Sequence, residues 1–503
     1  MSTRPGAAAA GARRPSAPGA ATAPGAGPGL PRLGSRGAAG RGGGRVSHVP
    51  LPPEWRATTS QVSGAFTQFA AAGASPTVGV PLGRNLLTGA PVCCDPLSWF
   101  TRARLIANPS AAVLGLPALG KSTLIRRMVI GLAGGGVVPL VLGDLKPDYA
   151  DVVRALGGQV VRLGRGLGSL NVLDAGALGA AAQRLGGAAG ARLAEEAHGR
   201  RTAVVEALVT LVRGVRPSDT ERAVLSAGLR VLAQRGPATP LLADLLRVLE
   251  QGPEPVRLPT LDRGDRLRYQ AAVDPLQRSL LSLLDGPLGA VFATPTSEPL
   301  HLDAAAVCVD VSGVSAGDSV LQAAVLLACW AEGFGAVEAA NALADAGAGP
   351  QRRFLIVLDE LWRVLRSGSG MVDRVDELTR LNRSAGVGQV LVTHSLADLR
   401  ALRDPEDRAK ARGFVERAGL VACGGLPAQE LDELGEVVRF TRAERRVVTS
   451  WSTPPGWDIA ATPPGLGKFL LKCGQRPGIP VQVELTAAET SSGLHDTNRR
   501  WQP

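Results

Sequence analysis

Short runs of apolar residues recur along the chain, and several are followed by glycine or an acidic residue. Continuous apolar runs of this length are typical of strands buried on both faces of a parallel sheet. The runs that we expect to be strands are 111–114, 137–142, 159–163, 306–311, 354–358 and 389–393, with two more around 419–423 and 467–471. Turn residues and alternation between 50 and 105 also predict short strands ahead of these.

A different periodicity marks the helices. Between about 176 and 290 apolar residues recur at spacings of three and four, as in Val204, Leu208 and Leu211, which predicts a helical insertion. Ser218 and Glu221 form a capping box at the start of one of its helices. Outside the insertion, helices are expected after residue 122 and over 318–344, 361–365 and 373–384.

Strands that alternate with helices in this way predict an α/β fold built on a parallel sheet. The expected organisation, in chain order, is a disordered Arg/Gly/Ala/Pro-rich tail over 1–46, a first part of the core over 47–175, an all-helical insertion over 176–290, a second part of the core over 291–485 and a polar, extended C-terminal tail over 486–503.

Charge is concentrated in the N-terminal tail. The formal net charge of the 503 residues is +11, and residues 1–50 contribute seven arginines and no acidic residue. The rest of the chain, at about +4, is not strongly basic. Nucleic acid or an acidic membrane could bind the tail, and a solvated linker explains its composition equally well.

The cysteines and the apolar segments limit the compartment. The six cysteines show no C-x-x-C spacing, so a disulfide framework and a zinc site are not expected, and a reducing cytoplasm fits. No apolar leader is visible at the N-terminus. The longest apolar candidate, 128–143, is broken by three glycines and Pro139, so no transmembrane segment is expected.

A phosphate-binding loop follows the first predicted strand. The segment GLPALGKST fits G-x-x-x-x-G-K-[ST], in which small residues let consecutive backbone N–H groups surround a phosphate. Lys121 is expected to bind the β and γ oxygens, and the Ser122 hydroxyl to bind Mg²⁺. The helix that follows directs its N-terminus at the same anion. The predicted nucleotide-binding residues are Gly115, Ala118, Leu119, Gly120, Lys121, Ser122 and Thr123.

A pair of acidic residues ends the buried run 354–358. Asp359 can hold Mg²⁺, and Glu360 beside it can orient or activate the attacking water. A strand that merely ends in acidic residues is common, but a phosphate-binding loop in the same chain favours the catalytic interpretation. Asp144, Lys146, Asp148 and Tyr149 follow another buried run, at the sheet edge where α/β proteins bind ligands.

Five segments together give the chain a family resemblance: GLPALGKST, GDLKPDYADVVRALGGQVVRLG, NVLD, LIVLDELWRVL and LTRLNRSAGVGQVLVTHSLADL. From about 79 to 490 it resembles the conjugative-transfer, or type IV secretion, ATPases of the FtsK/HerA-like branch of P-loop proteins. The resemblance implies a RecA-like P-loop NTPase core with a helical insertion, which assembles as a ring, usually a hexamer. It also implies ATP hydrolysis with Mg²⁺ at a membrane-embedded export channel.

The resemblance carries residue roles over by position. It makes Asp359 the Mg²⁺ carboxylate and Glu360 the catalytic base. Arg383 matches a basic position ahead of the last core strand, which makes it a candidate arginine finger acting on a neighbouring subunit, with Arg380 as the second candidate. Surface charge on a helix explains both arginines almost as well.

Two features depart from the family pattern. His394 stands where the family usually has a glutamine that senses the γ-phosphate; histidine can still donate a hydrogen bond, but its charge varies with pH. The Arg-rich tail stands where many members have a large N-terminal domain, which puts docking to the channel in doubt.

The sequence therefore predicts an ATP-hydrolysing motor for conjugation or type IV-like secretion. It would be a cytoplasmic homo-oligomer, with a peripheral place at the inner face of the membrane and channel proteins, and possible DNA, as partners. The alternative is a soluble DNA translocase or helicase of the same superfamily, without a secretion channel. An ATP-gated scaffold without hydrolysis is disfavoured by the intact Lys121 and Glu360.

Overall fold

The computed structural model describes residues 75–496, except for 236, 238, 316, 367–370, 381–385, 397–401, 403 and 454–461. The chain is divided into two units, Met1–Phe66 and Thr67–Pro503. The first unit, and with it the tail expected over 1–46, lies outside the described residues.

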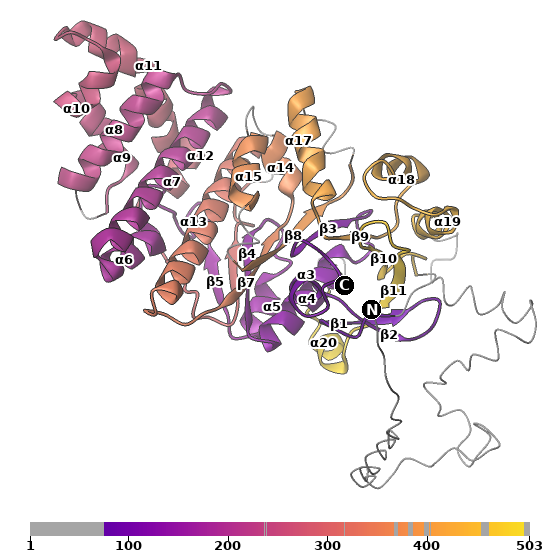
Figure 1. Cartoon of the computed structure of the whole chain (residues 1–503). Coiled ribbons are helices and arrows are strands. Elements are labelled where there is room, and N and C mark those ends of the chain that lie inside the picture. The colour runs from indigo at the N-terminus through magenta and orange to yellow at the C-terminus, as the bar shows by residue number, and fades with distance from the viewer. Residues whose placement is uncertain are drawn as a thin grey trace, which may run out of the picture. The chain divides into compact units, whose positions relative to one another are not determined.

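One 11-stranded sheet, in the order β2-β1-β11-β10-β9-β3-β8-β7-β4-β6-β5, runs through the described part of the second unit (Figure 1). Its strands are β1 (Pro81–Asn85), β2 (Pro91–Cys93), β3 (Ser110–Leu114), β4 (Val137–Asp144), β5 (Gln159–Arg162), β6 (Val307–Asp310), β7 (Arg353–Leu358), β8 (Val387–Thr393), β9 (Leu420–Cys423), β10 (Lys468–Lys472) and β11 (Ile479–Val483). Every apolar run that the sequence predicted as a strand belongs to this sheet, so the α/β prediction is confirmed.

The sheet has a parallel part and an antiparallel extension. Strands β9, β3, β8, β7, β4, β6 and β5 run parallel, whereas β10, β11, β1 and β2 continue the sheet as antiparallel neighbours. The carboxyl ends of β3, β8, β7 and β4 therefore lie side by side. Loops that follow these four strands meet at one edge, where open α/β sheets bind ligands.

Alternation along each central strand divides the core between the two faces of the sheet. In β7, Phe354, Ile356 and Leu358 belong to one apolar cluster, and Leu355 and Val357 belong to the other. Successive side chains of a strand point to opposite faces, so a continuous apolar run is what a sheet covered on both sides requires.

Helices cover both faces. On the face of Leu355, the apolar cluster includes residues of α4 and α5; on the face of Ile356 it includes α13, α14 and α17. The helices of the core are α3 (Pro96–Thr101), α4 (Lys121–Gly134), α5 (Ala150–Ala155), α13 (Ser319–Asp345), α14 (Leu361–Arg366), α15 (Met371–Arg380), α17 (Pro405–Glu416), α18 (Ala428–Leu434), α19 (Arg442–Trp451) and α20 (Ala487–Ser491).

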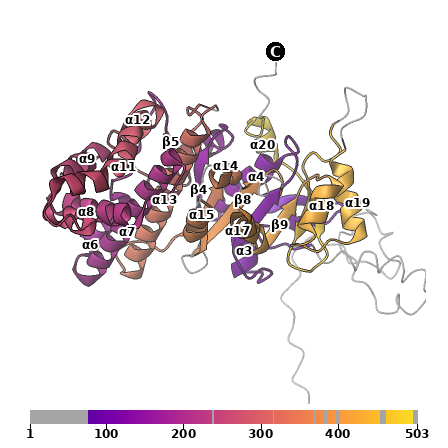
Figure 2. The same ribbon diagram turned by 90° about the horizontal axis from the view of Figure 1, so that it is seen from above.

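Helices α6 to α12 lie in sequence between β5 and β6. They are α6 (Gly176–Leu185), α7 (Gly187–Arg213), α8 (Asp219–Arg235), α9 (Leu242–Gln251), α10 (Glu254–Arg257), α11 (Arg266–Leu284) and α12 (Gly286–Phe292), with a 3₁₀ turn, η2 (Leu258–Thr260). Strands β5 and β6 pair directly, with Gln159 opposite Val307, so this segment leaves and re-enters the sheet at neighbouring strands. Figure 2 shows these helices gathered on the side of α13, which contacts α6 and α7.

Among the described helices, α13 is long and apolar enough to cross a membrane, with a mean hydropathy of 1.6, although the sequence analysis expected no such segment. Within the protein, 89% of its apolar window is buried, because it packs on β4. Glycines make the packing close: a Cβ on Gly333 would lie 2.4 Å from a methyl carbon of Leu142. The burial is typical of a core helix.

The C-terminal region differs from expectation. It was expected to be polar and extended from 486, yet Ala487–Ser491 forms α20. A capping box between Thr486 and Glu489 starts the helix, and Glu489 forms an ion pair with Arg127 of α4. This tertiary contact holds a segment whose composition alone suggested a tail.

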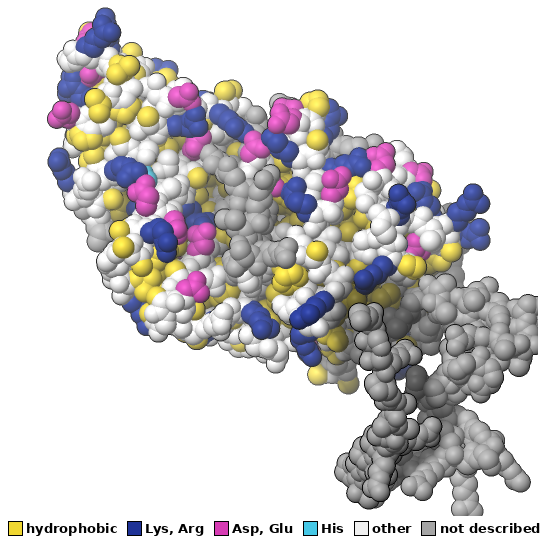
Figure 3. Space-filling model, viewed as in Figure 1, with side chains coloured by type: hydrophobic (Ala, Val, Ile, Leu, Met, Phe, Trp, Pro, Cys, Tyr) yellow, Lys and Arg dark blue, Asp and Glu magenta, His cyan; other side chains and the backbone are white. Residues whose placement is uncertain are grey.

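Charges of both signs are spread over the surface. On the face drawn in Figure 3, Lys and Arg side chains are interspersed with Asp and Glu side chains over both the helical segment and the core. Exposed side chains of opposite charge form ion pairs such as Arg230–Glu195 and Arg412–Glu416. This distribution agrees with the modest net charge of the chain outside its N-terminal tail.

Candidate functional site

The predicted phosphate-binding loop joins β3 to α4. Gly120 caps the helix in the left-handed conformation, with φ of 95°, and Ala118 also has a positive φ, of 63°. Positive φ is costly for alanine, and such strain is concentrated at ligand sites. No side chain caps the first turn of α4, so its N–H groups remain directed at the loop, as anion binding requires.

Segments far away in sequence support this loop. The Leu116 N–H donates to the Gly425 carbonyl at 3.0 Å, and the Gly467 N–H donates to the Leu119 carbonyl at 3.0 Å. A Cβ on Gly115 would lie 3.2 Å from the Gly424 Cα. Glycine at 115 is therefore needed both by the loop itself and by its close approach to the chain after β9.

The two side chains expected to bind phosphate and Mg²⁺ are held by the protein itself. Lys121 is buried, and its Nζ donates to the carbonyls of Gly115, at 2.6 Å, and Leu116, at 3.0 Å. The Ser122 hydroxyl donates to Asp148 Oδ2 at 2.9 Å, and Asp148 Oδ1 is paired with the buried Arg126 at 2.9 Å.

Asp359 lies at the end of β7, where the sequence predicted it. Its Oδ2 accepts a hydrogen bond from the Tyr149 hydroxyl at 3.1 Å, and its Oδ1 accepts one from the Glu360 N–H at 2.8 Å. Burial, together with the charge of Glu360, raises the pKa of Asp359 to about 6. A nearby cation would offset both effects.

Glu360 follows in a strained conformation, with φ of 52°. Its Oε1 accepts a hydrogen bond from Lys146 Nζ at 2.9 Å, and its Oε2 accepts one from Trp362 Nε1 at 2.6 Å. Burial alone would raise the pKa of Glu360, but the contacts with His394 and Lys146 outweigh it and hold this pKa well below its ordinary value.

His394 follows β8, which lies between β3 and β7 in the sheet. Its Nε2 is 3.6 Å from Glu360 Oε1. Its Nδ1 is buried and has no hydrogen-bond partner among the described residues. The structure therefore places His394 beside Glu360, between the strand that leads to the phosphate-binding loop and the strand that leads to the carboxylates.

The arginine predictions stay open. Arg380 is the last residue of α15, but its side chain lies outside the described part of the chain. Arg383 lies outside the described residues altogether.

The segment after β4 completes the site. Asp144 accepts hydrogen bonds from the N–H groups of Asp148, Tyr149 and Ala150, at 3.0, 2.8 and 3.2 Å, which folds this turn back over the sheet edge. Burial raises the pKa of Asp144 to about 7, despite these bonds. The turn brings Lys146, Asp148 and Tyr149 to the predicted site residues.

Sequence reasoning placed these residues at the ligand edge without giving them roles. It gave no role to Trp362, whose indole N–H donates to Glu360. The position of Trp362 two residues after the acidic pair was the available signal.

The described part of the chain contains residues suited to Mg²⁺. The described residues include no group of three or more His, Cys, Asp or Glu side chains able to hold a metal ion. Nucleotide sites instead bind Mg²⁺ through one or two protein oxygens plus substrate phosphates and water. The Ser122 hydroxyl and the half-buried carboxylate of Asp359 supply such oxygens, so the residues fit this ion.

A cavity of about 560 Å³ adjoins the start of α4. The phosphate-binding loop contributes Gly120 and Thr123, and the C-terminal segment contributes the rest: Thr462, Pro463, Pro464, Leu466, Gly467, Lys468, Gln482, Val483, Leu485 and His495. Sequence reasoning missed this cavity, because no local sequence pattern indicates that residues more than 300 positions apart line the same cavity.

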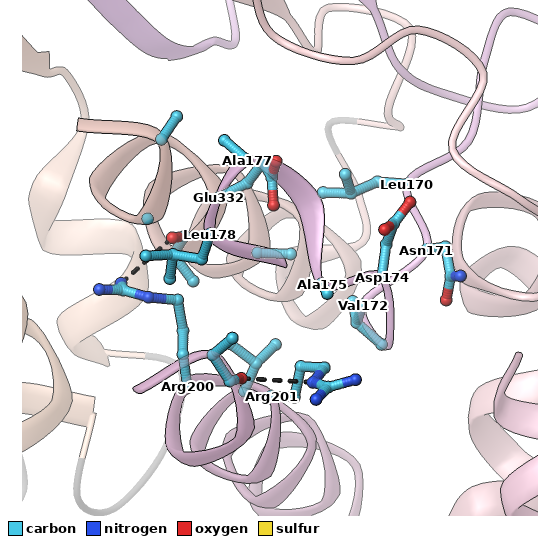
Figure 4. Close-up of a pocket in the computed structure, with 16 residues that line it drawn as sticks. Leu170, Asn171, Val172, Asp174, Ala175, Ala177, Leu178, Arg200, Arg201 and Glu332 are labelled. Atoms are coloured by element: carbon cyan, nitrogen blue, oxygen red, sulfur yellow. Dashed lines mark hydrogen bonds between the residues drawn. The ribbon is translucent and has the colours of Figure 1, made fainter. Parts of the chain in front are cut away.

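A second, smaller cavity of about 30 Å³ lies between α6, α7 and α13 (Figure 4). Arg200 donates there to the Ala331 carbonyl at 3.2 Å, and burial, with the charge of Asp174, raises the pKa of Glu332 to about 7. None of its lining residues belongs to the phosphate-binding loop or the acidic pair. It is therefore separate from the candidate site.

Comparison with known proteins relates the chain to others by structure. No family model matches the chain, and no curated protein sequence matches it. Plasmid coupling protein TrwB in complex with the non-hydrolysable ATP analogue ADPNP is 14% identical, with a TM-score of 0.49, over 84% of this chain and 92% of that chain. The cytoplasmic domain of the type VII secretion ATPase EccC of Thermomonospora curvata is 14% identical, with a TM-score of 0.31, over 86% of this chain and 32% of that chain.

VirB4 of Thermoanaerobacter pseudethanolicus gives a stronger match. Its structure is 16% identical in sequence, has a TM-score of 0.61 and covers 83% of this chain and 99% of its own. The chain therefore has the P-loop α/β fold of VirB4.

Proposed function

We propose that this protein is an ATP-hydrolysing motor that drives conjugative DNA transfer or type IV-like secretion. The observation that carries the proposal is that the predicted phosphate-binding loop and the predicted acidic pair meet at one edge of the sheet. Ser122 and Asp359 come from segments more than 230 residues apart, yet both contact the turn after β4, through Asp148 and Tyr149. A phosphate-binding loop beside an acidic pair suits phosphoryl transfer to water.

Each side chain has a distinct task in the proposed reaction. Lys121 binds the β and γ oxygens, while the N–H groups of the loop and of α4 surround the phosphates. Ser122 and Asp359 hold Mg²⁺, which neutralises charge on the transferring phosphoryl group. Glu360 orients the attacking water and accepts its proton, and His394 beside it donates a hydrogen bond toward the γ-phosphate.

The nucleoside is assigned to the cavity beside Gly120 and Thr123. Its volume of about 560 Å³ lies in the range of small-molecule pockets. Thr123, two residues beyond Lys121, lines this cavity. In this proposal the cavity lies on the side of the loop away from the acidic pair. The triphosphate would then extend from the cavity toward Glu360.

The choice of a secretion motor rests on the sequence resemblance and on the fold shared with VirB4. A ring, usually of six subunits in such proteins, is part of the proposal, as are a cytoplasmic location and partners in a membrane channel. The proposal gives Arg383, or else Arg380, the part of an arginine finger in a neighbouring site.

Phosphate release by the purified protein with ATP and Mg²⁺ tests the hydrolytic part. We expect turnover that requires both, and particles in mass photometry that correspond to a closed ring. Absence of turnover at every protein concentration, with correct folding by circular dichroism, would contradict the proposal.

The same assay separates the motor from its alternative. A soluble DNA translocase or helicase should hydrolyse ATP many times faster when single- or double-stranded DNA is added. A motor for assembly or protein export need not respond. Strong stimulation, together with unwinding or translocation in the absence of any membrane component, would favour the alternative.

A further inference from the structure

The turn after β4 contacts both halves of the proposed site through side chains two residues apart. Asp148 accepts the Ser122 hydroxyl at 2.9 Å, and Lys146 Nζ donates to Glu360 Oε1 at 2.9 Å. The turn thus connects the residue proposed to bind Mg²⁺ with the residue proposed to activate water.

The backbone of this turn is fixed. Asp144 accepts three of its N–H groups, and Asp148 is paired with Arg126, whose side chain is only 2% exposed. The Lys146 side chain, by contrast, is 61% exposed. The ammonium group can therefore change partners by rotation of its stem while the turn stays in place.

Glu360 is held by two donors in this arrangement. Lys146 and Trp362 donate to its two oxygens, at 2.9 and 2.6 Å, and the residue is only 7% exposed. Each donor occupies one of the lone-pair positions of the carboxylate. Departure of Lys146 frees a position on Oε1 for a water molecule.

We propose that Lys146 is a positioning residue that keeps Glu360 inactive by donating a hydrogen bond to its Oε1. When a γ-phosphate binds, the Lys146 ammonium group moves from Glu360 to the phosphate oxygens. The inference rests on the proposed function and adds a switch to it. The end of a triphosphate carries more negative charge than one carboxylate and offers three acceptor oxygens, so it competes successfully for the ammonium group. A diphosphate lacks that group and leaves Lys146 on Glu360.

Lys146→Met tests the competition, because it keeps the length of the stem and removes the charge. We expect the affinity for a non-hydrolysable ATP analogue to fall about tenfold, the scale of one hydrogen bond to a charged group, with ADP affinity unchanged. Lys146→Arg should retain most of the preference for the triphosphate. Lys410→Met, at a surface lysine paired with Asp373 and Glu406, is the matched control and should behave as the wild type.

A double-mutant cycle of Lys146→Met with Glu360→Gln measures how the two substitutions couple in the affinity for the triphosphate analogue, and the sign of this coupling tests the inference. If Lys146 is shared, removing the charge of Glu360 strengthens binding of the triphosphate analogue, and this gain shrinks in the Lys146→Met background. If Glu360 merely repels the phosphate, the gain stays or grows, because no ammonium group screens the repulsion. The second result would overturn the inference.

Trp362 supplies an independent readout, because its indole contacts the same carboxylate. We take its signal as the fluorescence difference between each protein and its Trp362→Phe counterpart. The triphosphate analogue, and not ADP, should change this signal in the wild type, and Lys146→Met should abolish the change. A fluorescence change that persists in Lys146→Met would overturn the inference. It would also be overturned if Lys146→Met lost as much hydrolysis as Glu360→Gln while its nucleotide affinities stayed unaltered.

Failure of the switch and failure of the proposed function remain distinguishable. A wild-type protein that hydrolyses no nucleotide contradicts the proposed function. A wild-type protein that hydrolyses ATP, with Lys146→Met indistinguishable from Lys410→Met in every measurement, contradicts only the switch.

Discussion

Two adjacent carboxyl groups, Asp359 and Glu360, differ in pKa because their surroundings differ. Burial raises the pKa of Asp359 to about 6, whereas contacts with His394 and Lys146 overcome the burial of Glu360 and lower its pKa. Neighbouring acids whose pKa values are pushed apart are typical of sites that divide two tasks between them. The proposed division is metal binding by the first and water activation by the second.

Lys121→Ala should abolish hydrolysis and weaken nucleotide binding, because the β and γ oxygens lose their point charge. Phosphate release and the binding of a fluorescent ATP analogue measure the two effects. Turnover at the wild-type rate would refute the assignment of the phosphate-binding loop.

Glu360→Gln should bind ATP and hydrolyse it at least about 100-fold more slowly, the lower end of what a general base contributes. The amide keeps the shape of the side chain and cannot take a proton. Single-turnover kinetics check this, and hydrolysis within about threefold of the wild type would mean that another residue is the base.

At the scale of elements, close packing of α13 on β4 determines the geometry of the sheet edge. Gly333 faces Leu142, and a Cβ on Gly143, where φ is 115°, would lie 2.2 Å from a methyl carbon of Leu326. Neither interface has room for a larger residue. Since β4 ends in the turn that carries Lys146, this packing also positions the proposed site.

Gly333→Val should lower the free energy of unfolding by about 1–3 kcal/mol, the usual cost of overpacking a core. Thermal unfolding measures the change. Gly199→Val is the control, because a Cβ on that glycine of α7 meets no atom within 4 Å, and it should change stability little. Equal effects of the two substitutions would show that α13 can move away from β4.

Glu332 of α13 should make stability depend on pH. Burial raises its folded-state pKa to about 7, above the value of about 4.3 for an unfolded chain. Between these values the folded state binds a proton that the unfolded state does not, so stability falls as pH rises from about 4 to 7. Above that window the buried charge destabilises the fold.

Glu332→Gln should therefore stabilise the protein by about 1–3 kcal/mol at pH 8 and change little at pH 4. Urea unfolding at both pH values measures this. A gain that is equal at the two pH values would mean that the carboxyl group titrates normally.

At the scale of the whole molecule, the proposed ring would complete each nucleotide site with an arginine from the neighbouring subunit. Helix α15 carries Arg380 at its end and precedes β8, which begins at Val387, whereas His394 beside the acidic pair follows the other end of that strand. In the proposed ring an arginine ahead of β8 acts on the site of a neighbouring subunit, where the planar guanidinium group suits phosphate oxygens better than a lysine does.

Arg383→Ala should bind ATP and lose hydrolysis, since trans-acting arginines contribute about 10³–10⁵ in turnover. Mixing Arg383→Ala with Lys121→Ala subunits should restore part of the activity, because some interfaces then pair an intact loop with an intact finger. Phosphate release across a series of mixing ratios measures the effect. Normal hydrolysis by Arg383→Ala would contradict the assignment of Arg383. Loss of hydrolysis only in Arg380→Ala would make Arg380 the arginine finger instead.

The sequence by itself determined the features that depend on neighbours along the chain. The spacing of Gly115, Gly120 and Lys121 predicted the phosphate-binding loop, and continuous apolar runs predicted the strands, because a strand buried on both faces admits few polar residues. The acidic pair after β7 and the helical periodicity after residue 176 were also predicted from neighbouring residues alone.

Only the tertiary structure decided which of these features meet. Lys146 and Glu360 are 214 residues apart in sequence and form one hydrogen bond, and Gly425 and Gly467 support a loop that precedes them by about 300 positions. The cavity beside Thr123 has its other wall in the C-terminal segment. The physical reason is that strand order, here β9-β3-β8-β7-β4, is set by packing of the whole sheet, and no local pattern encodes it.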